Sequence, residues 1–277
     1  MSHLLYGAHV HANGIRQHYL RFGGTAGARA ARDPVILIPG ITSPAITWGF
    51  VGEAIGAQLD CYVIDVRGRG LSEAGPSIDY TLDAQAADVV ALAKALGLAR
   101  YSVLGHSMGA RIAIRAARLQ PPGLARVVLA EPPMSGPGRR PYPAQLPWYL
   151  EAIALARKGC TAEDMRPFCP TWTDEQLRLR AEWLHTCEPA AVEASFRGFH
   201  EDDVHSDLPH IQLPMLLLAA ERADVIRSED IEECRRLAPH LQVAKVPEAG
   251  HMLPWDNAAG FYRALGDFLG CPVVATP

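Results

Sequence analysis

The sequence lacks an excess of charge of either sign. Its 26 lysines and arginines face 30 aspartates and glutamates, which gives a formal net charge of -4 at neutral pH. The basic residues are scattered along the chain, and they form no basic stripe that could neutralise a phosphate backbone. We therefore expect no nucleic-acid partner. The composition is still compatible with a small acidic substrate held by a local cluster of cations.

Long apolar runs are also missing. No stretch approaches the roughly 20 apolar residues that a membrane-spanning helix needs. The opening residues, MSHLLY, lack the basic segment and apolar run of a secretory signal. The sequence therefore predicts no membrane association and a cytoplasmic location.

Cysteine is sparse and widely spaced. The six cysteines show no Cys-x-x-Cys spacing, so neither a zinc site nor a dense disulfide framework is predicted. We expect free thiols, no bound metal and no cofactor.

Short apolar runs alternate with helix-like stretches along most of the chain, and 49% of the residues are hydrophobic. The runs predict buried parallel strands, because continuous apolar runs suit strands covered on both faces: residues 35–38, 61–65, 101–104, 127–130, 215–219 and 242–246. Helices are expected at residues 45–59, 82–96, 108–119, 228–237 and 258–269. This alternation predicts an α/β protein with a mostly parallel, doubly wound sheet.

Two regions depart from the alternation. Asn13-Gly14 lies between alternating residues, which predicts a two-residue hairpin and an antiparallel start to the sheet. Between residues 132 and 209 the strand pattern stops, and helices are expected at 143–157, 161–168, 174–185 and 189–199. We therefore predict a core of residues 1–131 and 210–277 with a helical cap, 132–209, inserted into it.

One strand-to-helix turn carries a chemical motif. Gly105-His106-Ser107-Met108-Gly109 follows an expected strand and precedes an expected helix, which is the context of the nucleophile elbow typical of the α/β-hydrolase fold. The flanking glycines remove side chains that would collide in so tight a turn. Ser107 is therefore the predicted nucleophile.

The same motif predicts an oxyanion hole. The Met108 N–H lies at the start of the following helix, where it can donate to a developing oxyanion. The second donor is expected in the loop at residues 39–43, with the Ile41 N–H as the candidate.

A base and an acid are expected further along the chain. His251 follows the last predicted strand, where this fold places its general base. Two carboxylates qualify as the acid that orients it: Asp224, in the loop after residues 215–219, and Glu131, at the end of the strand before the cap. The residues alone leave this choice open.

Several segments resemble the N-formylmaleamate deformylase family far more specifically than the elbow does. They include ANGIRQHYLR, PGITSPAITWGF, DVRGRG, GHSMGAR, PPMSGPGRR, AEWLHTC and GHMLPWD. The resemblance implies a serine-type deformylase, without metal or cofactor, that removes formate from N-formylmaleamate to give maleamate during nicotinate degradation. It also implies an aspartate at the position of Glu131, so the glutamate is a departure from the family pattern.

The substrate implied by the resemblance carries a carboxylate, and an anion in a closed pocket needs a fixed cationic partner. The arginine candidates are Arg67, Arg69, Arg111, Arg139 and Arg140. Trp48, beside the expected oxyanion loop, is the aromatic candidate for the substrate pocket.

Two other functions fit the same fold. A carboxylesterase or lactonase would use the same triad on another acyl group, and a ligand receptor would retain the triad but turn over slowly. Beyond a small carboxylate-bearing substrate no partner is implied. The sequence is compatible with a homo-oligomer but does not determine the oligomeric state.

Overall fold

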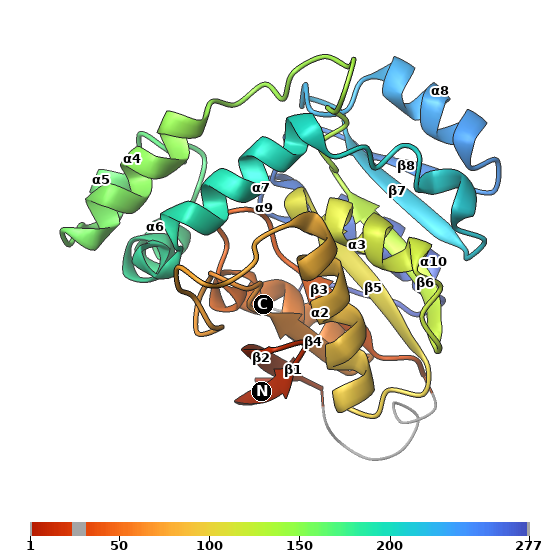
Figure 1. Cartoon of the computed structure of the whole chain (residues 1–277), viewed down its shortest axis with the longest axis horizontal. Helices are drawn as coiled ribbons and strands as arrows, with labels where there is room; N and C mark the ends of the chain where they lie inside the picture. The colour runs from red at the N-terminus through yellow and green to blue at the C-terminus, as the bar shows by residue number, and fades with distance from the viewer. Residues whose placement is uncertain (1, 24–31, 276–277) are drawn as a thin grey trace.

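The computed structural model describes residues 2–23 and 32–275 (Figure 1). Its centre is an eight-stranded sheet in the order β1-β2-β4-β3-β5-β6-β7-β8. The strands are β1 Leu4–Ala12, β2 Ile15–Phe22, β3 Val35–Ile38, β4 Cys61–Ile64, β5 Tyr101–His106, β6 Leu124–Ala130, β7 Met215–Ala220 and β8 Gln242–Val246. β2 pairs antiparallel with β1 and β4, and the remaining neighbours are parallel. The predicted mostly parallel sheet is confirmed.

Helices cover both faces of this sheet (Figure 1). The alternation of side chains along β3 shows the two faces, since Ile36 and Ile38 join one buried cluster whereas Val35 and Leu37 join the other. α2, α3 and α8 pack into the first cluster, and α1 and α10 into the second. These helices are α1 Gly49–Gly56, α2 Leu82–Ala95, α3 Met108–Arg118, α8 Ser228–Leu237 and α10 Ala258–Leu269.

The first hairpin and the first helix show how closely local sequence sets local structure. Asn13 and Gly14 both have positive φ, 48° and 76°, which is what a two-residue hairpin turn requires. The helix expected at 45–59 begins as a 3₁₀ turn, η1 Ala45–Trp48, before α1.

A helical region connects β6 to β7, where the sequence predicts the inserted cap. It contains α4 Leu146–Arg157, α5 Ala162–Met165, α6 Asp174–Trp183, η2 Leu184–Thr186, α7 Pro189–Glu201 and η3 Leu208–His210. α5 is shorter than predicted because Pro167 has no N–H with which to continue the helix. The boundaries 132 and 209 stay a prediction.

Two features are absent from the residues that the structure describes. None of their helices is long and apolar enough to cross a membrane. They also contain no cluster of three or more His, Cys, Asp or Glu side chains arranged to hold a metal ion.

Candidate active site

Ser107 lies in a strained turn between β5 and α3. Its φ of 53° and ψ of -119° are unusual for a residue with a side chain. A Cβ at Gly105 would lie 2.1 Å from the Gly109 oxygen, and one at Gly109 would lie 2.0 Å from the Ile38 oxygen. Both glycines are therefore needed for the backbone to pass close by, and the turn has the geometry of a nucleophile elbow.

Two backbone N–H groups are the candidates for the oxyanion hole. Met108 is the first residue of α3, so its N–H has no partner within the helix. Ile41 belongs to the loop after β3, which lines the same cavity as Ser107. Met108 and Ile41 thus lie where the sequence predicts the oxyanion hole, and their role as its donors stays a prediction.

His251 is held by a buried carboxylate. Its Nδ1 lies 3.4 Å from Glu131 Oε2, and the Glu131 side chain is fully buried. The other oxygen, Glu131 Oε1, accepts the Ala220 N–H at 2.6 Å, which fixes the carboxylate in place. A carboxylate at Nδ1 leaves Nε2 as the ring atom that can accept a proton.

His106 forms a hydrogen bond to the backbone of His251, the predicted base. Its Nε2 lies 2.8 Å from the backbone oxygen of His251, and since a carbonyl only accepts, Nε2 carries the proton. Burial and the charge of His251 lower the pKa of His106 to about 3, although the hydrogen bond to the His251 carbonyl opposes the fall. The ring also packs against Trp48 and the His251 ring, both at a centroid distance of 4.9 Å. His106 therefore stays neutral and positions the loop that carries His251.

Asp224, the other predicted acid, lies elsewhere. Its two oxygens accept bonds from the Arg227 guanidinium at 2.6 and 2.8 Å, and its side chain is 61% exposed. That ion pair lowers the pKa of Asp224. The structure thus brings Glu131, and not Asp224, to His251.

Burial affects both members of the His251–Glu131 pair. It raises the pKa of the Glu131 carboxyl to about 8, although the Ala220 N–H and the charge of Arg140 oppose the rise. It lowers the pKa of His251 to about 4, against the charge of Asp256. A neutral imidazole at neutral pH follows from the second shift.

The pH dependence of the reaction is expected to follow this pair. His251 can take the Ser107 proton only when the imidazole is neutral and Glu131 is ionised. The His251–Glu131 pair must therefore have lost both of its titrating protons before the reaction begins. We expect kcat/KM to rise with pH between about 4 and 8 and then to level off. Initial rates in overlapping buffers at constant ionic strength measure this, and a profile that is flat over the range would contradict it.

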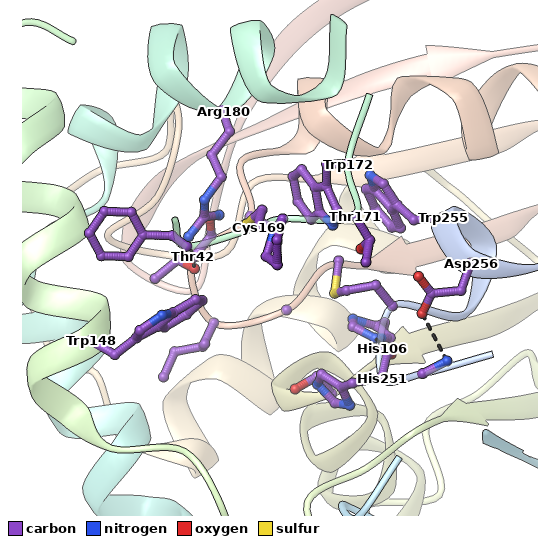
Figure 2. A pocket seen from close by; sticks show the side chains of 18 of the residues that line it. Thr42, His106, Trp148, Cys169, Thr171, Trp172, Arg180, His251, Trp255 and Asp256 are labelled. Carbon is purple, nitrogen blue, oxygen red and sulfur yellow. Dashed lines mark hydrogen bonds between the residues drawn. The ribbon is translucent and has the colours of Figure 1, made fainter. Parts of the chain in front are cut away.

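A cavity of about 650 Å³ opens between the elbow and the cap. Ser107, His251 and the loop at residues 40–43 form its floor, and cap residues including Trp148, Trp172 and Arg180 form the opposite side. Figure 2 shows these cap side chains facing His106 and His251 across the cavity. A substrate bound there contacts the nucleophile, the base and the cap at once.

Residues 33–258 match the family model of the alpha/beta hydrolase fold. The chain belongs to this family. The elbow and the late histidine described above are features of this fold.

Individual members of the alpha/beta hydrolase family give a closer comparison. The chain is 58% identical to N-formylmaleamate deformylase of Pseudomonas putida over 99% of this chain and 100% of that protein. It superposes on the crystal structure of an N-formylmaleamic acid deformylase from Pseudomonas putida S16 with a TM-score of 0.89 and 56% identity, covering 94% of this chain and 100% of the other. It is 25% identical to 2-(acetamidomethylene)succinate hydrolase of Mesorhizobium japonicum, over 85% of this chain and 87% of that one.

None of the six residues predicted to bind the substrate, five arginines and Trp48, lines this cavity. Arg67 forms a bidentate ion pair with Asp88, both bonds at 2.6 Å. Trp48 is fully buried and packs beneath the cavity, against His106 and Trp255. These side chains are used for packing and structural pairing, so the predicted substrate contacts are not supported.

Arg69 forms hydrogen bonds to the loop at residues 39–43 that contains Ile41. Its Nε donates to the Ile41 oxygen at 3.1 Å, and its Nη2 donates to Ala191 and to Ser195 of α7. It therefore ties the loop to the cap, and it is a positioning residue for Ile41. Arg139 and Arg140 are paired with Glu233 and Asp230 on α8, in that order.

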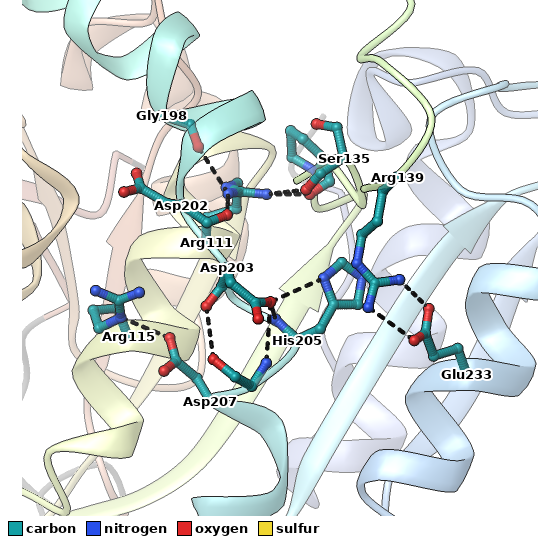
Figure 3. A network of polar contacts seen from close by, with 12 residues as sticks. Arg111, Arg115, Ser135, Arg139, Gly198, Asp202, Asp203, His205, Asp207 and Glu233 are labelled. Carbon is teal, nitrogen blue, oxygen red and sulfur yellow. Dashed lines mark hydrogen bonds and ion pairs between the residues drawn. The ribbon is translucent and has the colours of Figure 1, made fainter. Parts of the chain in front are cut away.

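Arg111 joins the elbow helix to the cap (Figure 3). Its guanidinium donates to the carbonyl oxygens of Pro133, Ser135, Gly198 and Asp202, at distances between 2.8 and 3.0 Å. All four acceptors would lose this partner in an Arg111→Met variant.

The Arg111→Met variant is therefore expected to be less stable rather than altered in specificity. Unsatisfied buried acceptors cost about 1–3 kcal/mol each, so we expect a loss of about 3 kcal/mol or more and a fall in the thermal midpoint of roughly 6 °C or more. Differential scanning calorimetry measures it. An unchanged midpoint with a raised KM would instead indicate a substrate contact.

The structure adds two residues that the sequence did not single out. The buried Tyr142 hydroxyl interacts with Ser107 and Tyr149, which opposes the rise that burial causes in the pKa of Tyr142. Arg180 lines the cavity from α6. A signal for Arg180 exists in the sequence, since it lies on the same helix face as the buried Leu177 and Ala181. Tyr142 follows a proline-rich segment without periodicity, and no comparable signal marks it.

Proposed function

We propose that this chain is a serine hydrolase that cleaves the formyl C–N bond of N-formylmaleamate, giving maleamate and formate. The observation that carries the proposal is the 58% identity to an N-formylmaleamate deformylase over 99% of the chain. The arrangement of Ser107, His251 and Glu131 around one cavity supports it, because this is the machinery of acyl transfer.

In the first half of the reaction, Ser107 Oγ attacks the formyl carbon while His251 takes the hydroxyl proton. The carbonyl oxygen becomes an oxyanion that accepts bonds from the N–H groups of Met108 and Ile41, donors of a kind worth about 10²–10³ in rate each. Glu131 stabilises the imidazolium that forms.

The intermediate then collapses. His251 passes its proton to the maleamate nitrogen, the C–N bond breaks, and a formyl ester is left on Ser107. Water attacks this ester with His251 again as the base, which releases formate and restores the serine. The departing nitrogen also carries the maleyl carbonyl, so it leaves more easily than an ordinary amine.

The proposal extends to two further features. We propose that residues 132–209 act as a cap that closes the cavity over a small carboxylate-bearing substrate. We also propose a cytoplasmic location, for which the similarity to a bacterial deformylase is the support.

A substrate panel tests the proposal against an esterase or lactonase. We expect kcat/KM for N-formylmaleamate to exceed that for p-nitrophenyl esters and simple lactones by about 10²-fold or more, because only the former engages the whole site. Equal or higher values for the esters or lactones would favour a carboxylesterase or lactonase. Tight binding with negligible turnover of every compound would favour a receptor.

A further inference from the structure

Among the described residues, Arg180 is a buried cation without an acidic partner. Its side chain extends from α6 into the cavity that holds Ser107, and only 5% of the residue is exposed. In the part of the chain that the structure describes, its guanidinium bonds only to Thr42, and its Nε has no partner. A buried charge of this kind destabilises the protein unless an opposite charge neutralises it. Here an anionic ligand in the cavity could supply that charge.

Two tryptophans hold the guanidinium without neutralising it. Its central carbon lies 5.9 Å from the ring centre of Trp148 and 5.7 Å from that of Trp172. Figure 2 shows Arg180 descending between these rings toward Thr42. Cation–π contacts of this type orient an arginine while leaving its N–H groups free for an anion.

The contacts with Thr42 are weak. Nη1 lies 3.4 Å from the Thr42 backbone oxygen, and Nη2 lies 3.4 Å from its hydroxyl. Charge-assisted bonds to a carboxylate are shorter, at about 2.7–2.9 Å, and about twice as strong as neutral ones. A carboxylate can therefore take over these donors at small cost.

The rival cation in the cavity is already neutralised. Arg222 also lines the cavity, but its guanidinium is paired with Glu248 and its side chain is 61% exposed. An exposed, paired arginine offers an anion much less than a buried, unpaired one.

We propose that Arg180 binds the carboxylate of the substrate and so selects anionic formyl amides over neutral ones. This rests on the function proposed above. Thr42 directly follows Ile41, so an anion at Arg180 lies beside the loop that donates to the formyl oxygen. The short, cis-configured N-formylmaleamate has its carboxylate and formyl group at its two ends, and the site would hold both ends near one loop.

The test compares two substrates, N-formylmaleamate and its methyl ester, which lacks the negative charge. For the parent enzyme we expect kcat/KM to be about 10²-fold or more higher for the acid, as a bidentate arginine–carboxylate contact would give. In Arg180→Met the acid should lose this advantage, whereas the ester should react within about threefold of the parent rate. Arg180→Lys, which retains the charge but not the fork, should be intermediate.

Matched controls complete the experiment. Arg178→Met changes an exposed arginine of the same helix, paired with Glu182. It should leave kcat/KM unchanged for both the acid and the ester. Arg222→Met should leave the preference for the acid in place. The proposal is overturned if the parent does not prefer the acid, if Arg222→Met removes the preference, or if Arg180→Met and Arg180→Lys both lose ester and acid hydrolysis equally.

The outcomes separate this proposal from the function on which it rests. A parent enzyme that releases no formate from either substrate would refute the deformylase function. Formate release with an acid preference that does not depend on Arg180 would refute only the role of Arg180.

Discussion

Ser107→Ala is expected to lower kcat/KM for N-formylmaleamate by about 10⁴-fold or more. Without the hydroxyl no formyl ester can form, and nucleophile removal in serine hydrolases leaves only what the oxyanion hole and binding supply. Steady-state formate release measures the loss. Affinity for the substrate, measured by calorimetry on the inactive variant, should change little, because the Met108 and Ile41 donors and the cavity walls stay in place.

Ser102→Ala is the matched control for this variant. Ser102 lies on the same strand, β5, and is also buried, but its hydroxyl has no hydrogen-bond partner among the described residues and it does not line the cavity. We expect activity within about twofold of the parent, as for a substitution that removes no satisfied contact. Residual activity in Ser107→Ala comparable to that of Ser102→Ala would disprove the serine mechanism.

Glu131→Gln is expected to lower kcat by about 10³–10⁴-fold. An amide at this place can still accept the Ala220 N–H, but it neither fixes the required tautomer of His251 nor stabilises its charged form. Rates at saturating substrate measure the effect, with KM as the check that binding is retained.

Asp224→Asn makes the same chemical change at the other predicted acid. Asp224 is exposed and paired with Arg227, so we expect activity within about twofold of the parent, because exposed ion pairs contribute little. A large loss in Asp224→Asn with a small one in Glu131→Gln would reverse the assignment of the acid.

The sequence predicted the nucleophile, the base and the fold because each depends on local pattern. The Gly105–Gly109 turn is specified by residues adjacent in the chain, and the order of strands follows from alternating apolar runs. The choice between Glu131 and Asp224 was different. Both follow strands at the same edge of the sheet, and only the observed side-chain directions show which one reaches His251.

The arginines show where sequence reasoning reaches its limit. Arg67, Arg69 and Arg111 were selected for their closeness in sequence to the elbow and the Gly-rich loop, yet their partners lie on α2, α7 and the cap entry. Arg180 lies more than 70 residues after the elbow and reaches the cavity only through the packing of the cap. Which cation is left unpaired depends on tertiary contacts throughout the molecule, and no local pattern records that.

The departure from aspartate to glutamate at position 131 also has a structural reading. Glu131 has a φ of 50°, in the left-handed region, at the point where the chain leaves β6. From there its longer side chain bonds the Ala220 N–H with one oxygen and reaches His251 with the other. The substitution is therefore compatible with the role that the family resemblance implies for this position.

The most direct test of the account follows the products formed from N-formylmaleamate by proton NMR. Cleavage of the formyl C–N bond by Ser107 predicts formate and maleamate in equal amounts from the parent enzyme, and neither above background from Ser107→Ala. Maleate and formamide would mean attack at the other carbonyl of the substrate, and no product from the parent enzyme would mean that the chain is not a deformylase. Either result would contradict the account.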